Sequence, residues 1–157
     1  MDIQTQEAND QSVGSTLLPG QTANSLKVYL MAKQCLGKHL CENSAYGCAE
    51  TVNAIVDAAL GYPAGGSAST YLMYNVLKSS PRFEQVTTPL PGDIIISPTG
   101  YGTNPIMPNG HVGIVGIYGI LSNDSYNGLL EENYTLAMWK DHYNGVGGYP
   151  IYYFRAL

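Results

Sequence analysis

Cys48 stands where a helix is predicted to begin, and it is the residue best placed for nucleophilic chemistry. It follows Gly47 and precedes apolar residues at i, i+3, i+4, i+7 and i+8, the spacing of one buried helical stripe: Val52, Ile55, Val56, Ala59 and Leu60. Unpaired N–H groups at a helix N-terminus favour thiolate over thiol and can bind an oxyanion. Cys48 is therefore the candidate nucleophile, and the alternative is a buried structural cysteine.

A cysteine nucleophile needs a base, and the chain has three histidines. His111 begins a predicted strand after a loop rich in Gly, Pro and Asn, so its side chain can overlook a site at the end of the sheet. His39 lies in the loop before the cysteine, and His142 lies in a polar run that favours solvation. We rank His111 above both, and the alternative is a structural histidine.

A third polar group is expected to orient the imidazole. The strand predicted after His111 offers Asn123 and Asp124, which cannot both face it because side chains alternate across a strand. The same residues also suit a turn. Glu131 heads a second cluster, with Glu132 and Asn133, that could take this role instead.

Other site chemistries find little support. Residues 123–134 partly match a calcium-binding loop, but Tyr134 stands where the loop requires a bidentate glutamate. No CxxC or HxxxH spacing indicates zinc, and no glycine-rich segment ends in GK[ST]. We therefore expect neither a metal nor a cofactor.

The elements that must hold these residues change from helix to strand along the chain. Helices are expected from a cap at Asn24 or Ser25 to Gly37, from Cys48 to Gly61, and from a cap at Ser67 or Ser69 to Ser79. Strands are expected at 83–86, 94–96, 111–118, 120–125 and 149–154, with a helical or irregular piece at 136–142. Helices followed by an antiparallel meander predict an α+β fold. Residues 1–22 are expected to be a polar, poorly ordered lead-in, and 23–157 a single domain.

Composition limits the possible partners and compartments. The 157 residues carry a net charge of −5, which argues against nucleic acid as a partner. The three cysteines leave at least one free thiol, which favours a reduced compartment. Neither a signal peptide nor a membrane span is predicted, so we expect synthesis in the cytoplasm.

The three sequence motifs together resemble those of the papain-like NlpC-type and CHAP-type cysteine peptidases and amidases, which cut the peptide part of bacterial cell walls. The matching segments are 46–53 (YGCAETVN), 91–95 (PGDII) and 110–115 (GHVGIV). The resemblance implies a papain-like fold with N-terminal helices packed on an antiparallel sheet. It also implies Cys48 as nucleophile, His111 as base and a polar residue on the next strand, for which Asn123 is the first choice because it needs no extra loop. Glu131 followed by Asn133 matches the CHAP-type pair in type, after a longer connection.

The resemblance further implies a peptidoglycan endopeptidase or amidase acting on the stem peptide, with the Cys48 N–H and the Tyr46 hydroxyl binding the oxyanion. Residues 120–125, Trp139 and 152–155 look like the tail of phage-encoded members. A phage endolysin would act after a holin opens the membrane, and an antibacterial effector would be paired with an immunity protein. The alternatives are an acyltransferase of the same fold and a non-catalytic wall-binding or virion structural module.

Overall fold

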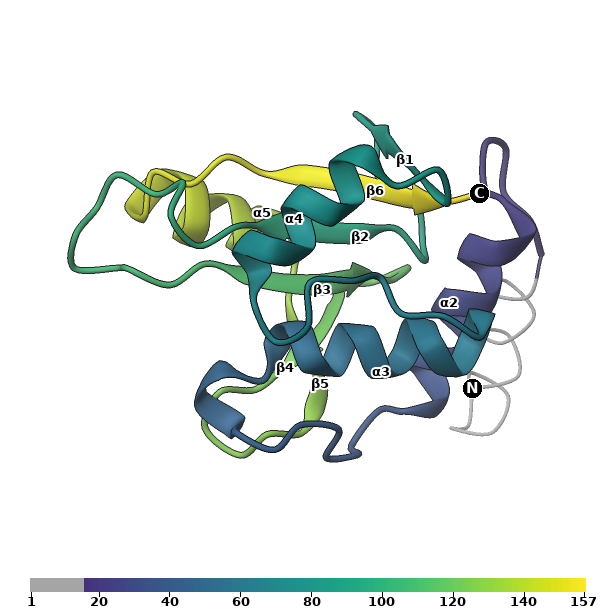
Figure 1. The fold of residues 1–157 in the computed structure, drawn as a ribbon, viewed down its shortest axis with the longest axis horizontal. Coiled ribbons are helices and arrows are strands. Elements are labelled where there is room, and N and C mark those ends of the chain that lie inside the picture. Colours follow the sequence, from purple (N-terminus) through teal and green to yellow (C-terminus); the bar gives the residue numbers. More distant parts are fainter. Residues whose placement is uncertain (1–15) are drawn as a thin grey trace, which may run out of the picture.

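The computed structural model describes residues 16–157, and Figure 1 shows helices preceding a sheet. Residues 1–15 of the predicted lead-in lie outside the described part. The helical elements before the sheet are α2 (Ala23–Gln34), η1 (Ser44–Tyr46), α3 (Cys48–Leu60) and α4 (Thr70–Ser79). None of the helices within residues 16–157 is long and apolar enough to cross a membrane.

The helices begin at polar caps or at a glycine. Thr22 caps α2 by accepting a hydrogen bond from the Ser25 N–H, while the Ser25 side chain accepts one from the Thr22 N–H. The predicted cap at Asn24 or Ser25 was therefore wrong by two or three residues, because Ser25 is the second partner of the capping box. Ser69 caps α4, as one of the two predicted choices. In α3 the apolar stripe is buried as predicted, with Val52, Ile55 and Val56 fully covered.

The sheet has six antiparallel strands in the order β1-β6-β2-β3-β4-β5. The strands are β1 (Phe83–Val86), β2 (Ile94–Ser97), β3 (His111–Val115), β4 (Ile120–Asn123), β5 (Leu130–Tyr134) and β6 (Tyr152–Ala156). Strands β2, β3 and β4 pair in sequence order as the predicted meander, and β5 extends it, whereas the last strand inserts between β1 and β2. The predicted strands at 111–118 and 120–125 are shorter than expected, and β5 was not predicted.

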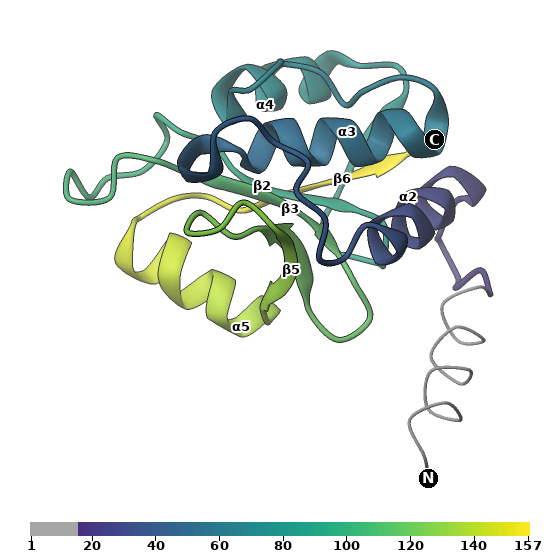
Figure 2. The same cartoon turned by 90° about the horizontal axis from the view of Figure 1, so that it is seen from below.

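The two sides of the sheet are covered by different elements. Figure 2 shows α2, α3 and α4 on one side and α5 (Leu136–Trp139) on the other, continued by the π-helical turn η2 (Lys140–Val146). We call the first side the helical face; its core includes Ile94, Ile96, Val112, Ile114 and Phe154. We call the second side the aromatic face; its core is Ile95, Ile120, Trp139, Tyr143, Tyr149 and Tyr153.

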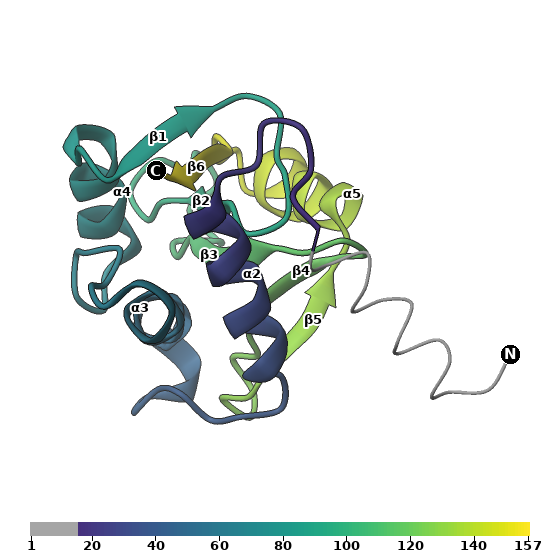
Figure 3. The same ribbon diagram turned by 90° about the vertical axis from the view of Figure 1, so that its right-hand side faces the viewer.

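A tight turn and a buried ion pair hold the start of β2 against α2. Gly92 has a φ of +94°, and a Cβ there would lie 1.9 Å from the Ser25 carbonyl oxygen, so only glycine fits. The next residue, Asp93, accepts two hydrogen bonds from Arg155 of β6 at 2.9 and 2.8 Å. Figure 3 shows α2 beside α3, so this turn fixes the helix that supports the Cys48 helix.

Candidate active site

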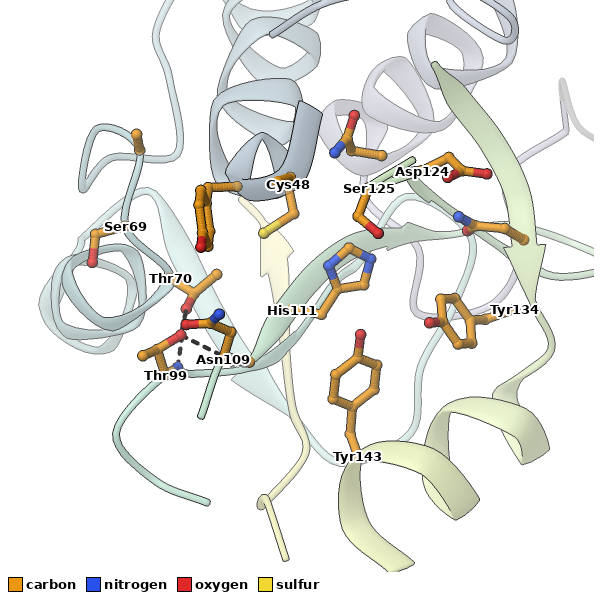
Figure 4. Close-up of a pocket in the computed structure, with 16 residues that line it drawn as sticks. Cys48, Ser69, Thr70, Thr99, Asn109, His111, Asp124, Ser125, Tyr134 and Tyr143 are labelled. Carbon is orange, nitrogen blue, oxygen red and sulfur yellow. Dashed lines mark hydrogen bonds between the residues drawn. The ribbon is translucent and has the colours of Figure 1, made fainter. Parts of the chain in front are cut away.

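A cavity of about 650 Å³ lies at the end of the sheet where α3 and β3 begin (Figure 4). Its walls come from η1 and the start of α3, from the start of α4, from the β2–β3 loop and the start of β3, from β4, β5 and the turn that joins them, and from η2. Cys48 and His111 both line this cavity. The structure therefore brings the predicted nucleophile and the predicted base together.

Cys48 is the first residue of α3, and its side chain lines the same cavity as His111 (Figure 4). Gly47 is the N-cap and contributes no side-chain hydrogen bond, so it leaves the first N–H groups of the helix open to other partners. A Cβ on Gly47 would lie 2.5 Å from the Cβ and Sγ of Cys41 and 2.8 Å from the Asn43 carbonyl oxygen. This close approach requires glycine and fixes where the helix starts.

The Cys48 thiol is uncharged at neutral pH. Burial raises its pKa to about 11, because the thiolate loses its hydration. Hydrogen bonds from the backbone of Val112, Ala49 and Cys48 itself lower the pKa but do not outweigh burial. These hydrogen bonds lower the pKa of Cys48, as the position at the start of the helix predicts. The net shift of this pKa is nevertheless upward, because the sequence does not show how deeply the thiol is covered.

His111 begins β3 and is buried against three aromatic rings on the aromatic face, one from β5 and two from the covering elements α5 and η2. Its imidazole is stacked with Trp139 at a centroid distance of 5.2 Å and an interplanar angle of 25°, and with Tyr143 at 5.6 Å and 18°. Tyr134 lies 5.9 Å away at a tilt of 59°. Burial, and secondly the charge of His142, lower the pKa of His111 to about 4. The imidazole is therefore neutral at pH 7 and able to accept a proton.

The two side chains reach the cavity from opposite sides of the sheet. Cys48 packs against the helical-face core, whereas His111 is paired with Ser97, whose hydroxyl contacts Trp139 on the aromatic face. A neutral thiol can pass its proton to a neutral imidazole within hydrogen-bond reach when the sulfur attacks a carbonyl carbon. The arrangement therefore suits general-base catalysis without a preformed ion pair.

Two threonines connect the walls of the cavity next to the base. Thr70 donates a hydrogen bond from Oγ1 to Thr99 Oγ1 at 3.0 Å and accepts one from the Thr99 N–H at 3.0 Å (Figure 4). Thr99 Oγ1 also accepts from the Gly110 N–H at 2.9 Å. These bonds tie the start of α4 to the residue just before His111. The sequence analysis missed them because they join positions 29 and 11 residues apart.

Asn123, the first choice for orienting His111, lines the cavity but makes its hydrogen bonds elsewhere. Its Oδ1 accepts from the Cys41 thiol at 3.4 Å, and its Nδ2 donates to the Ser44 carbonyl oxygen at 2.8 Å. Asn123 is paired with Leu130, which lies in the helical-face core, and paired residues point to the same side of a sheet. Asn123 therefore faces away from the aromatic layer that surrounds His111 and fastens the loop that leads to Cys48.

The other predicted candidates are divided between the cavity and its surroundings. Asp124 lines the cavity beyond the end of β4, where its Oδ1 accepts from the Tyr126 N–H at 2.8 Å. Glu131 is not among the lining residues, and its carboxylate accepts from Asn127. Asn133 does line the cavity and accepts a hydrogen bond from the Ser122 hydroxyl. Tyr46 lines it too, from η1, and is 62% exposed.

The chain has the fold of the Tae3 effector. It matches the crystal structure of the type VI native effector–immunity complex Tae3–Tai3 from Ralstonia pickettii, with a TM-score of 0.58 and 18% sequence identity over 85% of this chain and 98% of the other. No protein-family model and no curated protein matches the sequence. The predicted α+β fold, with N-terminal helices packed on an antiparallel sheet, is confirmed.

The Tae3-like fold of this chain carries no cluster of metal ligands in its described part. Among residues 16–157, no group of three or more His, Cys, Asp or Glu side chains is placed to hold a metal ion. The cavity is instead lined mainly by Ser, Thr, Asn and Tyr around Cys48 and His111. Sequence reasoning gave neither Trp139 nor Tyr143 a role beside His111. Their spacing of four residues in a stretch with helical character could have placed both rings on one side.

Proposed function

We propose that this protein is a cysteine hydrolase that cleaves an amide bond in the stem peptide of bacterial peptidoglycan. The observation that carries the proposal is the pairing of Cys48, at an uncapped helix N-terminus, with His111 in one cavity. The fold shared with a type VI effector supports an antibacterial setting. The three sequence motifs around Cys48, Asp93 and His111 support the wall peptide as substrate.

The proposed reaction begins with a neutral Cys48 thiol and a neutral His111 imidazole. As the Cys48 sulfur attacks the peptide carbonyl carbon, its proton moves to the His111 imidazole and the carbonyl oxygen becomes an oxyanion. When the C–N bond breaks, the imidazolium gives this proton to the leaving amine. Water then attacks the thioester with His111 again acting as base, which releases the acid and restores the Cys48 thiol.

The oxyanion would be bound at the start of α3. The Cys48 N–H belongs to the uncapped first turn of the helix, and the exposed Tyr46 hydroxyl is a second donor on the same wall. Donors placed where negative charge develops stabilise the transition state more than the substrate. Removal of one such donor is expected to slow hydrolysis by about 100- to 1,000-fold.

The two rival functions have less support. A non-catalytic module predicts Cys48 buried and far from His111; the thiol is covered, but both residues line one cavity. Transfer of an acyl chain from a lipid predicts an apolar pocket beside the nucleophile, whereas polar residues such as Ser69, Thr99 and Asn109 line this one. Hydrolysis by water suits the polar cavity best.

The setting that we propose is an effector delivered to the wall of a rival bacterium and neutralised in its producer by an immunity protein. The Tae3 structure is an effector–immunity complex, and this is the observation that favours an effector over a phage endolysin released through a holin. The proposed place of action is the periplasm of the target cell.

Mass spectrometry of soluble fragments released from purified peptidoglycan tests the hydrolase. The wild type, Cys48→Ala and a matched Cys35→Ala control are compared; Cys35 is buried away from the cavity. We expect stem-peptide fragments from the wild type and from Cys35→Ala and none from Cys48→Ala. If the wild type releases no fragments, the wall substrate is wrong. If fragments appear only as amides of an added amine, the protein is a transferase.

A further inference from the structure

His111 is held by rings on several sides. Trp139, Tyr143 and Tyr134, which we call the aromatic clamp, have ring centroids 5.2, 5.6 and 5.9 Å from that of the imidazole; Figure 4 shows Tyr134 and Tyr143. Trp139 is fully buried and Tyr143 nearly so, so neither ring can move aside without leaving a cavity. Rotation of the imidazole about its side-chain bonds would push it into one of these rings.

The hydrogen-bonding groups expected to orient His111 are engaged elsewhere. None of the hydrogen bonds found within residues 16–157 involves the His111 ring, and those of the Asn123 side chain go to Cys41 and Ser44. A peptidase that relies on a third polar residue needs that residue in contact with the imidazole. In this cavity the contacts to the imidazole are aromatic.

We propose that the aromatic clamp, and not a hydrogen-bonded third residue, holds the His111 imidazole in the orientation that accepts the proton of Cys48. The clamp residues are positioning residues, because they act on the reaction through His111. The inference rests on the proposed function for its kinetic consequences, but the stacking itself can be measured without any substrate.

The aromatic clamp is attached to β2, the strand next to His111. Ser97 is paired with His111 across β2 and β3, and its hydroxyl accepts a hydrogen bond from Trp139 Nε1 at 3.1 Å. The ring that stacks on the imidazole is thereby fastened to the neighbour of His111. Tyr143 lies in the π-helical turn η2, and its ring packs on that of Trp139 at a centroid distance of 4.7 Å. Such turns are rare and occur often at functional sites.

Stacking also suits the proton transfer. The clamp adds no negative charge, so the imidazole stays neutral until it takes the Cys48 proton. In the intermediate the imidazolium then faces electron-rich rings, which attract a cation. Burial raises the pKa of Tyr143, so its hydroxyl stays protonated and does not compete as a base. A clamp of this kind orients the base, and its rings offset part of the cost that burial places on the transient imidazolium.

Paired substitutions at Tyr143 separate the ring from its hydroxyl. Tyr143→Phe keeps the ring and is expected to hold kcat within about threefold of the wild type. Tyr143→Leu removes the ring and is expected to lower kcat by about 10- to 100-fold with little change in KM, because a misplaced base slows the chemical step. Tyr153→Leu is the matched control, since Tyr153 is buried on the same face and makes none of the ring contacts found in the described residues.

Proton NMR of the histidine rings provides the readout that needs no substrate. The His111 ring protons, assigned with His111→Gln, should be shifted upfield by the stacked rings in the wild type, in Tyr143→Phe and in Tyr153→Leu, and less so in Tyr143→Leu. Equal loss of kcat in Tyr143→Phe and Tyr143→Leu would overturn the proposal and assign the role to the hydroxyl. An unchanged kcat in Tyr143→Leu, with a large loss in Asn123→Ala, would restore the amide as the orienting group. If no variant, including the wild type, hydrolyses peptidoglycan, the shifts still decide whether the clamp holds the imidazole.

Discussion

The two faces of the sheet place their catalytic candidates in different ways. On the helical face, aliphatic residues of α3 pack on β3, and Cys48 is placed by the backbone at the start of the helix. On the aromatic face, His111 is placed by side chains, namely Trp139, Tyr143 and Tyr134. The position of the nucleophile therefore depends on where a helix begins, whereas the position of the base depends on which rings surround it.

This difference predicts how substitutions in each half of the site affect activity and stability. A change that moves the start of α3 should displace Cys48 and destabilise the fold together, because the same contacts serve both. A change in the aromatic clamp should affect His111 with less effect on the helical core, because Trp139 and Tyr143 belong to a separate cluster.

Removal of the base tests the aromatic side most strongly. His111→Gln is expected to lower kcat by about 100- to 10,000-fold, the usual contribution of a general base. His39→Gln is the matched control, because His39 lies outside the cavity lining. Steady-state hydrolysis of a purified stem peptide measures both variants. A His111→Gln enzyme that keeps most of its activity would remove His111 from the reaction.

Gly47→Ala tests the helical side. Its Cβ would lie 2.5 Å from the Cβ and Sγ of Cys41, so the start of α3 must shift. We expect a large loss of kcat/KM together with a loss of about 1–3 kcal/mol in unfolding free energy, as for other overpacked sites. Gly145→Ala is the control, since its Cβ would meet only a carbonyl oxygen at 3.8 Å. Denaturant unfolding and kinetics measured on the same samples check whether stability and activity fall together.

Much of the helical side could be predicted from the sequence, and less of the aromatic side. The stripe Val52, Ile55 and Val56 predicts α3, and with it the place of Cys48, because helical periodicity is local. The short apolar run at 94–96 likewise predicts β2. Strand β5 was missed because Glu131 and Glu132 have low strand propensity, and its pairing with β4 supplies what propensity does not.

The aromatic clamp depends on contacts that the sequence does not encode locally. The η2 turn brings Tyr143 back over β3, so residues far apart in the chain meet at His111. The side to which Asn123 points also required the strand register, because alternation alone leaves Asn123 and Asp124 equally open. The rings around His111 and the side to which Asn123 points both depend on tertiary contacts, which local sequence patterns do not give.

Removal of the Thr99 hydroxyl is expected to have a smaller effect, because this group joins the start of α4 to the residue before His111. Thr99→Val removes the hydroxyl that contacts Thr70 and the Gly110 N–H, whereas Thr99→Ser keeps it. We expect Thr99→Val to lower kcat by about 3- to 30-fold through a shift of the neighbouring base, and Thr99→Ser to restore most of the rate. Equal rates for the two variants would show that these hydrogen bonds do not position His111.

The pH dependence distinguishes a neutral pair from an ion pair. His111 is neutral above its pKa of about 4 and Cys48 is a thiol below its pKa of about 11. Hydrolysis should therefore rise as the pH increases through about 4 and then level off. Alkylation of Cys48 by iodoacetamide should rise by about tenfold per pH unit toward 11, because only the thiolate reacts. Cys48→Ala gives the background from the other cysteines, and rapid alkylation at pH 5 would instead reveal a preformed thiolate.

The most direct test of the central claim is a double-mutant cycle on wall-fragment release with Cys48→Ala, His111→Ala and the double variant. If Cys48 from the helical face and His111 from the aromatic face act as one unit, each single substitution should abolish nearly all hydrolysis and the double variant should lose no more. Additive losses, or hydrolysis that persists in Cys48→Ala, would contradict a cysteine–histidine site assembled from the two faces of the sheet.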